Sequence, residues 1–290
     1  MALRKYNKMK IFLSILFFIT ASFNVQCQDL DSIKVVSWNV FLRPGILDDD
    51  QLGRVDGIGN YLNQTDADVL VLQEVFHRRS RKRLTKKLKK KFPYYTGIGP
   101  KSFFGVPSGV VIFSKHKIIE EKHISYRNGK GSDRLARKGA ISTAIQFFKT
   151  RIQIIGTHLQ AGGGKERDKI RRNQIRKMKS FKNEKNSPRL YVGDFNISSN
   201  TQKFNDLLAS LECSTDSISG ENQYTANFDD HELTEVKGKP KWIDFILLRK
   251  HRKSKFIRTK VEQPILKSES GARRLSDHNP IHSTIQINTE

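Results

Sequence analysis

Six apolar segments of the sequence end in polar side chains that could do chemistry together. The clearest is residues 191–196, Tyr-Val-Gly-Asp-Phe-Asn, in which Asp194 and Asn196 point to one face of an extended backbone. The other five segments end at Asn39, Glu74, His158, Asp244 and the pair Asp277 and His278. Carboxylate and amide oxygens suit Mg²⁺, and a histidine beside carboxylates suits a general base. Although Asp and Asn are also common turn residues, their repetition here predicts metal-assisted hydrolysis of a phosphoester.

The start of the chain, residues 1–27, has the pattern of a secretory signal peptide. Basic residues precede a short apolar core at residues 11–19, and small and polar residues follow it. A membrane-spanning helix needs about 20 apolar residues, so this segment is too short for a permanent anchor. We therefore expect cleavage near Cys27, a secreted or periplasmic protein, and one catalytic domain over residues 28–290. Attachment of a lipid to Cys27 is an alternative, which the large Gln26 before it disfavours.

The chain carries a formal net charge of +24, which predicts either an anionic partner or solubility through self-repulsion. Two amphipathic basic helices concentrate this charge, one at residues 77–92 and one at residues 165–182. The first has an apolar stripe at helical spacing that consists of Leu84, Leu88 and Phe92. The cationic faces are either solvated or dock on anionic lipids or nucleic acid. The sequence gives no sign of an obligate protein partner.

The remaining pattern indicates an α/β sandwich with two packed sheets. Strand-like runs cover residues 108–114, 140–148 and 151–158, and the last two have the pattern of a hairpin. The glycine-rich connection at residues 115–139 indicates a mobile loop, and one short helix is expected at residues 204–211. Cleavage of the signal leaves Cys213 without a cysteine partner, so stability must come from the core.

The ordered polar motifs resemble the endonuclease/exonuclease/phosphatase superfamily over nearly the whole chain after the signal. They are Trp38-Asn39, Gln73-Glu74, Thr157-His158, Gly193-Asp194-Phe195-Asn196, Asp244 and Ser276-Asp277-His278. Any one of these motifs is weak evidence, whereas all of them in the right order are specific. The resemblance implies an α/β fold, a four-layer α/β sandwich of two packed mixed β-sheets flanked by helices. It also implies phosphoester hydrolysis that depends on Mg²⁺, with Mn²⁺ or Co²⁺ as substitutes.

By the same resemblance, Glu74 is the principal metal ligand, with Asn39 beside it and Asp277 assisting. The alternative for Asn39 is an ordinary hydrogen bond at the end of a strand. The sequence offers no cysteine-histidine cluster of the kind that holds zinc. The resemblance therefore implies an oxygen-lined site for a hard divalent cation.

The other polar strand ends resemble residues that transfer protons and bind phosphate. His278 resembles the general base that activates the attacking water, and Asp244 resembles the residue that holds its other ring nitrogen. His158 and Asn196 resemble phosphate-binding donors. Asp194 resembles a residue that orients the water or assists the leaving group. The sequence leaves open how the proton duties divide among Asp194, His158 and His278.

Further motifs resemble secreted bacterial sphingomyelinases within the superfamily. They lie at residues 39–44, 73–76, 108–110, 138–140 and 157–161. Asp133 and Lys138 are similar to a pair around the scissile phosphate, and Arg171 begins a similar Arg-x-x-Gln element that ends at Gln174. This resemblance implies hydrolysis of sphingomyelin to ceramide and phosphocholine at a sphingomyelin-containing membrane surface.

Two departures keep a secreted nuclease of the same superfamily as the alternative. Bacterial sphingomyelinases commonly dock through an aromatic-tipped hairpin, and the late sequence has no clear one; Phe103-Phe104 is the only exposed-looking aromatic pair. The positive charge also exceeds what neutral choline headgroups require. A catalytically silent binding module is a third interpretation, which the intact set of polar strand ends disfavours.

Overall fold

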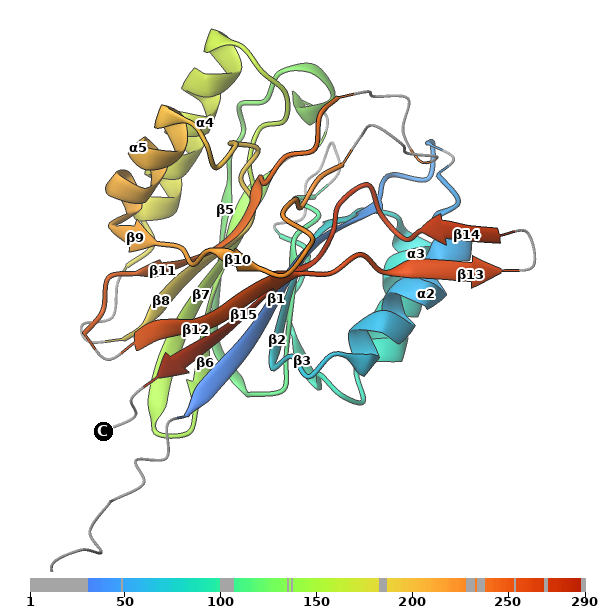
Figure 1. The fold of residues 1–290 in the computed structure, drawn as a ribbon, viewed down its shortest axis with the longest axis horizontal. Helices are drawn as coiled ribbons and strands as arrows, with labels where there is room; N and C mark the ends of the chain where they lie inside the picture. The colour runs from blue at the N-terminus through green and yellow to red at the C-terminus, as the bar shows by residue number, and fades with distance from the viewer. Residues whose placement is uncertain are drawn as a thin grey trace, which may run out of the picture. The chain divides into compact units, whose positions relative to one another are not determined.

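Two large mixed β-sheets and four α-helices make up the described part of the chain (Figure 1). The computed structural model describes residues 31–47, 49–99, 107–134, 136, 138–182, 187–227, 233, 238–252, 254–268 and 271–287. The predicted signal at residues 1–27, with Cys27, and the pair Phe103-Phe104 lie outside the described residues. Among the helices that are described, none is both long enough and apolar enough to cross a bilayer.

The first sheet places the strands that carry Asn39 and Glu74 side by side. β1 (Ser32–Leu42) runs parallel to β2 (Val69–Val75), and their register sets Asn39 opposite Gln73. The strand order of this sheet is β10-β12-β15-β1-β2-β4-β3. The other strands are β3 (Tyr94–Tyr95), β4 (Val111–Ser114), β10 (Ile218–Ser219), β12 (Ser254–Val261) and β15 (Ile281–Ile287).

The second sheet aligns the strand ends that carry His158, Asp194 and Asp244. β7 (Thr150–His158) runs parallel to β8 (Arg189–Asp194), with His158 opposite Asp194. β11 (Asp244–Arg249) runs antiparallel to β8, with Asp244 opposite Asp194. In the order β5-β6-β7-β8-β11-β9, the other strands are β5 (Ile118–Ser125), β6 (Gly139–Phe147) and β9 (Cys213–Ser214).

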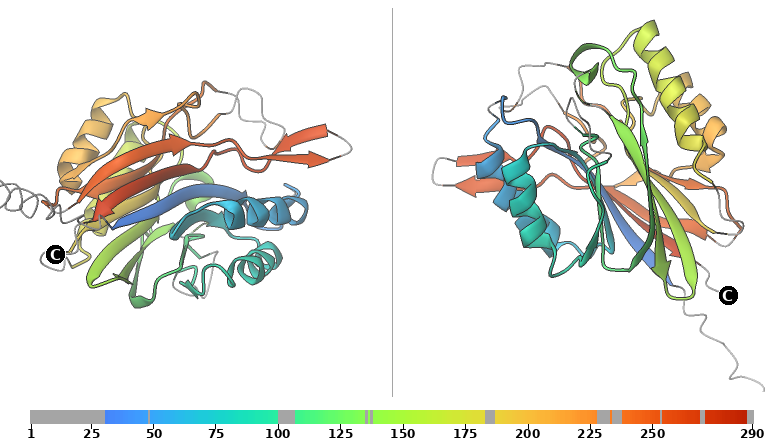
Figure 2. Two further views of the ribbon diagram at one scale, coloured as in Figure 1. Left: turned by 60° about the horizontal axis from the view of Figure 1, so that its bottom comes forward. Right: turned by 180° about the vertical axis from the view of Figure 1, so that it is seen from behind.

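Helices cover the outer face of each sheet, so the fold has four layers (Figure 2). α2 (Gln51–Gln64) and α3 (Arg78–Leu88) cover the first sheet. α4 (Lys165–Lys179) and α5 (Gln202–Leu211) cover the second. The predicted four-layer α/β sandwich of two packed mixed sheets is confirmed, and both basic segments form helices within their expected ranges.

Alternation along the strands divides the buried side chains among three apolar layers. On β1, Val35 lies in the central core between the sheets, whereas Val36 packs with the side chains of α2 and α3. On β7, Ile154 lies in the same central core and Ile155 packs with those of α4 and α5. Both faces of each sheet are therefore buried, and the strand ends are where polar side chains can meet a ligand.

Two expectations about the connections differ from the structure. The segment at residues 115–139, expected as a loop, contains the edge strand β5 and the 3₁₀ helix η1 (Gly131–Arg134). β5 was missed because its sequence, Ile-Ile-Glu-Glu-Lys-His-Ile-Ser, is largely half-exposed and lacks a regular apolar alternation. The strand expected at residues 108–114 begins only at β4, because Gly109 has φ of 71° and interrupts the extended backbone. The expected hairpin forms as β6 and β7, and the expected helix at 204–211 forms as part of α5.

A separate two-stranded hairpin lies late in the chain, formed by β13 (Ile265–Ser268) and β14 (Gly271–Arg274). The sequence that joins the two strands, Ser-Glu-Ser-Gly at residues 268–271, contains no aromatic residue. A late hairpin therefore exists, but it has no aromatic tip.

Candidate active site

A cavity of about 500 Å³ lies where the polar strand ends of both sheets meet. The predicted site residues that line it are Glu74, His158, Arg171, Asp194, Asn196, Asp277 and His278. Asn39, Asp244 and Lys138 do not line it, but each forms a hydrogen bond with a residue that does. Asp133 likewise borders it, because its Oδ2 accepts from the backbone N–H of the lining residue Ala161 at 2.7 Å and also pairs with Lys138. The fold therefore gathers these residues around one cavity.

Unusual backbone conformations place two of the polar side chains at the cavity. Glu74 has φ of 57° and Asn196 has φ of 51°, a left-handed region that residues with a Cβ rarely adopt. Such conformations cost free energy and concentrate at functional sites, where the surrounding structure holds them. At Gly193, with φ of 145°, a Cβ would lie 2.0 Å from the carbonyl oxygen of Thr157. Glycine there lets β7 and β8 bring His158 and Asp194 together.

His278 and Asp244 form a buried pair. Asp244 Oδ2 lies 2.8 Å from Nδ1 of His278, which leaves Nε2 on the side of Asp194, 3.9 Å from its Oδ2. The backbone around His278 is also held, since its carbonyl accepts from Nε1 of Trp38 at 2.8 Å and its N–H donates to Oγ of Ser276 at 3.2 Å. Burial alone would lower the pKa of His278. The charge and hydrogen bond of Asp244, together with two further carboxylates, instead raise this pKa well above its ordinary value.

His158 lies in a different network, whose centre is the buried ammonium of Lys138. Nζ of Lys138 lies 2.8 Å from Nε2 of His158 and 2.9 Å from both Asp133 Oδ2 and the carbonyl oxygen of Leu159. Nε2 of His158 also lies 3.3 Å from Oδ2 of Asp194. Lys138 therefore occupies a position behind His158 and has all three of its donors directed at protein acceptors.

The two networks give the groups between them different proton affinities. Burial, with the nearby charges of Lys138 and His278, lowers the pKa of His158 well below its ordinary value. The imidazole is therefore neutral, and Nε2 can accept from Lys138. Burial and the charge of Asp244 raise the pKa of Asp194 to about 7, against the opposing effect of the two cations.

Asn39 connects carboxylates from the two sheets. Its Nδ2 donates to Oε1 of Glu74 at 3.0 Å and lies 3.3 Å from Oδ2 of Asp194. Its Oδ1 accepts from the backbone N–H of Phe41 at 3.2 Å. In this orientation the amide holds the two carboxylates in place and directs its oxygen at the backbone.

The carboxylates of the site fit a divalent cation. Burial and the charge of Glu74 raise the pKa of Asp277 to about 7, against the effect of His278, so negative charge in this region is poorly compensated. Ligand atoms of Asp194, Asp244 and His278 lie within 4.8 Å of one another, and Oδ1 of Asp244 accepts no hydrogen bond from the described residues. Because His278 and Asp244 are bonded to each other, Glu74 and Asp277 are the carboxylates better placed for a cation.

Arg171 lines the cavity, but its guanidinium donates its hydrogen bonds to protein acceptors. Its Nη1 donates to the carbonyl oxygens of Gln160 and Gly162, each at 2.7 Å, and its Nη2 pairs with Asp168. Gln174 accepts from the backbone N–H of Gln160 at 2.9 Å. The Arg-x-x-Gln element therefore holds residues 160–162 at the cavity border.

Sequence reasoning missed two buried side chains that fix the site. Oγ1 of Thr225 accepts the backbone N–H groups of Ile243 and Asp244, each at 3.0 Å. Arg54, fully buried in α2, ties the end of β1 to residues 49 and 275 by donating to the carbonyl oxygens of Val40, Phe41, Asp49 and Leu275. No sequence signal distinguishes this threonine in a polar stretch, or this arginine in a helix, from surface residues.

Comparison with models of protein families shows the family of this chain. The model of the Endonuclease/Exonuclease/phosphatase family matches residues 21–278. The chain belongs to this family. The matched range includes every residue of the predicted site, from Asn39 to His278.

Relatives of known name narrow the class within the family. Phospholipase C from Staphylococcus aureus is 29% identical over 255 residues, which cover 78% of this chain and 76% of the relative. Sphingomyelinase C from Bacillus cereus is 28% identical over 301 residues, which cover 89% of this chain and 90% of the relative. The crystal structure of a Staphylococcus aureus beta toxin mutant with bound magnesium ions has a TM-score of 0.76 and 25% identity, and covers 87% of this chain and 99% of that chain.

This endonuclease/exonuclease/phosphatase family member is a phosphodiester hydrolase similar to bacterial sphingomyelinases. The magnesium-bound relative and the cluster of Asp194, Asp244 and His278 support a divalent metal in the site. The predicted family, fold and enzyme class are confirmed.

Proposed function

We propose that this family member hydrolyses sphingomyelin to ceramide and phosphocholine. The observation that carries the proposal is the likeness to sphingomyelinase C, which extends over most of both chains. Two motifs similar to those of sphingomyelinases, at residues 138–140 and 157–161, also meet in the fold, where Lys138 contacts His158.

His278 is the proposed general base. Its Nδ1 is held by Asp244, so Nε2 is the atom that takes the proton of the attacking water. The high proton affinity of this imidazole suits a proton acceptor, provided that the ring starts neutral. Because the pKa of His278 is raised, we expect turnover to increase with pH until that pKa is passed.

Glu74 and Asp277, with Asn39 beside them, are the proposed holders of the divalent metal, for which Mg²⁺ is the first candidate and Mn²⁺ or Co²⁺ are substitutes. When bound, the metal would supply positive charge that polarises a phosphoryl oxygen. Excess EDTA should then abolish turnover, and added Mg²⁺ should restore it in the wild type but not in Glu74→Ala. The matched control is Glu166→Ala, which changes an exposed glutamate outside the cavity. Full turnover in excess EDTA would contradict the metal assignment.

The second sheet provides the proposed phosphate contacts. Asn196 lines the cavity, and because its Nδ2 gives one hydrogen to the carbonyl of Leu159, the other remains for a phosphoryl oxygen. Lys138 acts through His158, which it holds and keeps neutral, Asp133 holds the ammonium of Lys138, and Arg171 acts by shaping the cavity border. Asp194, between both histidines, is the candidate for orienting the water or assisting the leaving group.

We also propose that the protein is exported through the signal at residues 1–27 and meets its substrate in a membrane surface. The signal pattern and the similarity to sphingomyelinases support this location. Edman sequencing of the protein purified from a culture supernatant or periplasm should begin near residue 28. Retention of residues 1–27 in the cytoplasmic fraction would contradict export.

The substrate is tested by two assays at equal enzyme concentration. We expect phosphocholine release from sphingomyelin vesicles and no nicking of supercoiled plasmid, with both measured in Mg²⁺. His278→Ala controls for contaminating hydrolases, because it should remove the phosphocholine signal. Plasmid nicking without phosphocholine release would reject the lipid substrate and favour the nuclease.

A further inference from the structure

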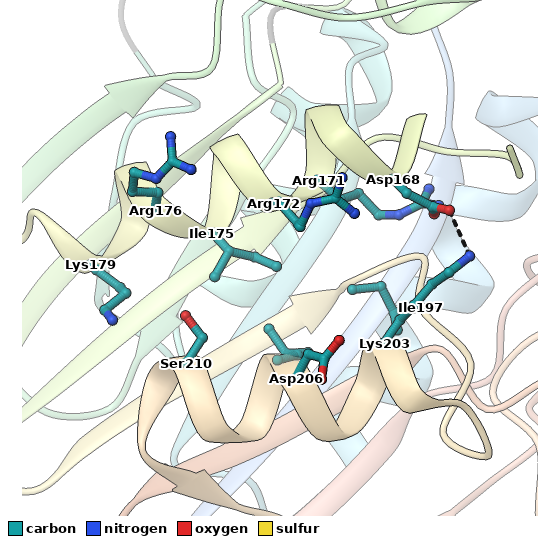
Figure 3. A pocket seen from close by; sticks show the side chains of 11 residues that line it. Asp168, Arg171, Arg172, Ile175, Arg176, Lys179, Ile197, Lys203, Asp206 and Ser210 are labelled. Carbon is teal, nitrogen blue, oxygen red and sulfur yellow. Dashed lines mark hydrogen bonds and ion pairs between the residues drawn. The ribbon is translucent and has the colours of Figure 1, made fainter. Parts of the chain in front are cut away.

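A groove of about 360 Å³ runs between α4 and α5, next to the catalytic cavity (Figure 3). Its floor contains the apolar side chains of Ile175, Ile197 and Leu207. Arg171, Ile197 and Lys203 line both this groove and the catalytic cavity, so the two hollows share a wall. This volume is in the range of small-ligand sites, which combine an apolar lining with a few polar anchors.

Three cations on the α4 rim form no ion pair with a described residue. Arg172, Arg176 and Lys179 are spaced by four and three residues, so they follow one another along the same side of the helix. All three are exposed, and within the described part of the chain none forms an ion pair. Positive charge on this rim is therefore available to a ligand.

Among the other charged side chains of the groove, Asp168, Arg171 and Lys203 form one ion-paired group, and Asp206 is bonded to a neutral amide. Asp168 pairs with both Arg171 and Lys203, the latter at 2.6 Å, as the dashed line in Figure 3 marks. Asp206 accepts a hydrogen bond from Gln202 at 2.9 Å. The lining as a whole has five cationic and two anionic side chains, so the groove favours an anion.

We propose that the α4–α5 groove binds one molecule of an anionic phospholipid. Its phosphate-bearing headgroup would contact Arg172, Arg176 and Lys179, and the start of an acyl chain would cover Ile175 and Leu207. An apolar floor under a row of cations matches a ligand with an apolar body and an anionic head. The eleven described residues that line the groove include no aromatic side chain, whereas single-stranded nucleic acid is usually held by base stacking on aromatic rings.

This inference goes beyond the proposed reaction, because the anionic lipid is a ligand and not the substrate. A lipid bound there would lie beside the catalytic cavity, since the two hollows share Ile197 and Lys203. The anionic lipid of a bilayer would then hold the α4–α5 face against the surface in which the substrate lies. Binding of an anionic lipid would account for the positive charge of the protein, which a zwitterionic substrate such as sphingomyelin does not require.

α3 supplies a matched control, because it is also strongly basic but does not contribute to this groove. Lys82, Lys86 and Lys89 are exposed there at the same spacing of four and three residues. The test variant is R172E/R176E/K179E and the control is K82E/K86E/K89E. Both change the net charge equally. Both proteins also carry His278→Ala, so that hydrolysis contributes no signal.

The experiment is calorimetric titration of each full-length protein with monomeric dioctanoyl phosphatidylglycerol. We expect the lipid to bind at least about tenfold more tightly than dioctanoyl phosphatidylcholine or inorganic phosphate. The α4 variant should lose at least about tenfold in affinity, and the α3 control should stay within about a factor of two of its parent. A neutral variant, R172Q/R176Q/K179Q, should fall between them.

Four results would overturn the proposal. They are equal loss in the α3 and α4 variants, equal binding of phosphatidylcholine, equal binding of inorganic phosphate, and tighter binding of an oligothymidylate that the α4 substitutions abolish. The last of these would assign the groove to nucleic acid. Because the titration contains no sphingomyelin, its outcome is separate from that of the substrate assay. R172E/R176E/K179E without His278→Ala should also retain phosphocholine release from detergent-dispersed sphingomyelin.

Discussion

His278 and His158 are buried on either side of the same carboxylate, yet their protonation is opposite. Their Nε2 atoms lie 3.9 Å and 3.3 Å from Oδ2 of Asp194. Asp244 stands behind His278 and raises its pKa, whereas Lys138 stands behind His158 and, with burial, lowers its pKa. Burial acts in the same direction on both rings. The difference therefore shows that the partner behind each imidazole decides which one takes a proton and which one stays neutral.

The largest expected effect comes from removing the histidine that takes the proton. His278→Ala should lower kcat on sphingomyelin by about 10² to 10⁴, since a positioned general base contributes that much. The circular dichroism spectrum and melting temperature should change little. Turnover like that of the wild type would show that the base lies elsewhere, with His158 as the first group to test.

Asp244→Asn should reduce the difference in pKa between His278 and His158 while both rings remain in place. The neutral amide can still bond to Nδ1, but it no longer stabilises an imidazolium, so the pKa of His278 should fall and kcat should drop by roughly 10². Titration followed by NMR of ring-labelled histidine reports the pKa directly. An unchanged pKa with full activity would remove Asp244 from the mechanism.

His282 provides a third buried histidine, whose Nε2 lies 3.8 Å from Oε2 of Glu262, further than the 2.8 Å between His278 and Asp244. Its Nε2 lies 2.8 Å from the hydroxyl of Tyr61, and burial lowers its pKa to about 4. Between pH 6.5 and 4 the unfolded chain binds the extra proton, so the free energy of unfolding should fall by about 3 kcal/mol as the pH falls. Denaturant unfolding of the wild type should show this loss beyond that of His282→Gln. The control His251→Gln, at a half-buried site in a turn, should behave like the wild type; a pH dependence unchanged by His282→Gln would contradict the assignment.

The smallest expected change in kcat comes from Lys138→Met, which removes the cation behind His158. Loss of the ammonium should raise the pKa of His158, because its charge is one of the causes that lower it. We expect kcat to fall about tenfold, a loss equal to part of one charge-assisted hydrogen bond. Lys130→Met, which changes an exposed lysine of the same connection, is the control. An unshifted His158 resonance with normal turnover would show that Lys138 is only structural.

The residues of the site could be predicted from sequence because their positions follow from local rules. A strand that stops at a polar residue places that residue at a sheet edge, and six such stops in one order predicted that Asn39, Glu74, His158 and the others lie together. Apolar alternation likewise predicted the packed sheets. Where the alternation was weak, as in the half-exposed edge strand β5, the prediction was wrong.

The contacts behind those residues could not be predicted from sequence, because they join segments far apart in the chain. Lys138 is predicted from sequence to contact the substrate phosphate, whereas the fold places its ammonium behind His158 and directs it at Asp133 and the carbonyl oxygen of Leu159. Thr225 and Arg54 have ordinary sequence surroundings and gain their roles only when distant backbone groups are brought to them.

Residue types and their order along the chain were enough to predict the family, the layers of the fold and the set of side chains available for chemistry. The tertiary structure decided the proton affinities of those side chains, because a pKa depends on burial and on neighbouring charges that the chain order does not place. It also decided where the positive charge is left uncompensated. α3 and α4 are both strongly basic, but among the described helices it is the packing of α4 against α5 that places cations without an ion pair above an apolar groove.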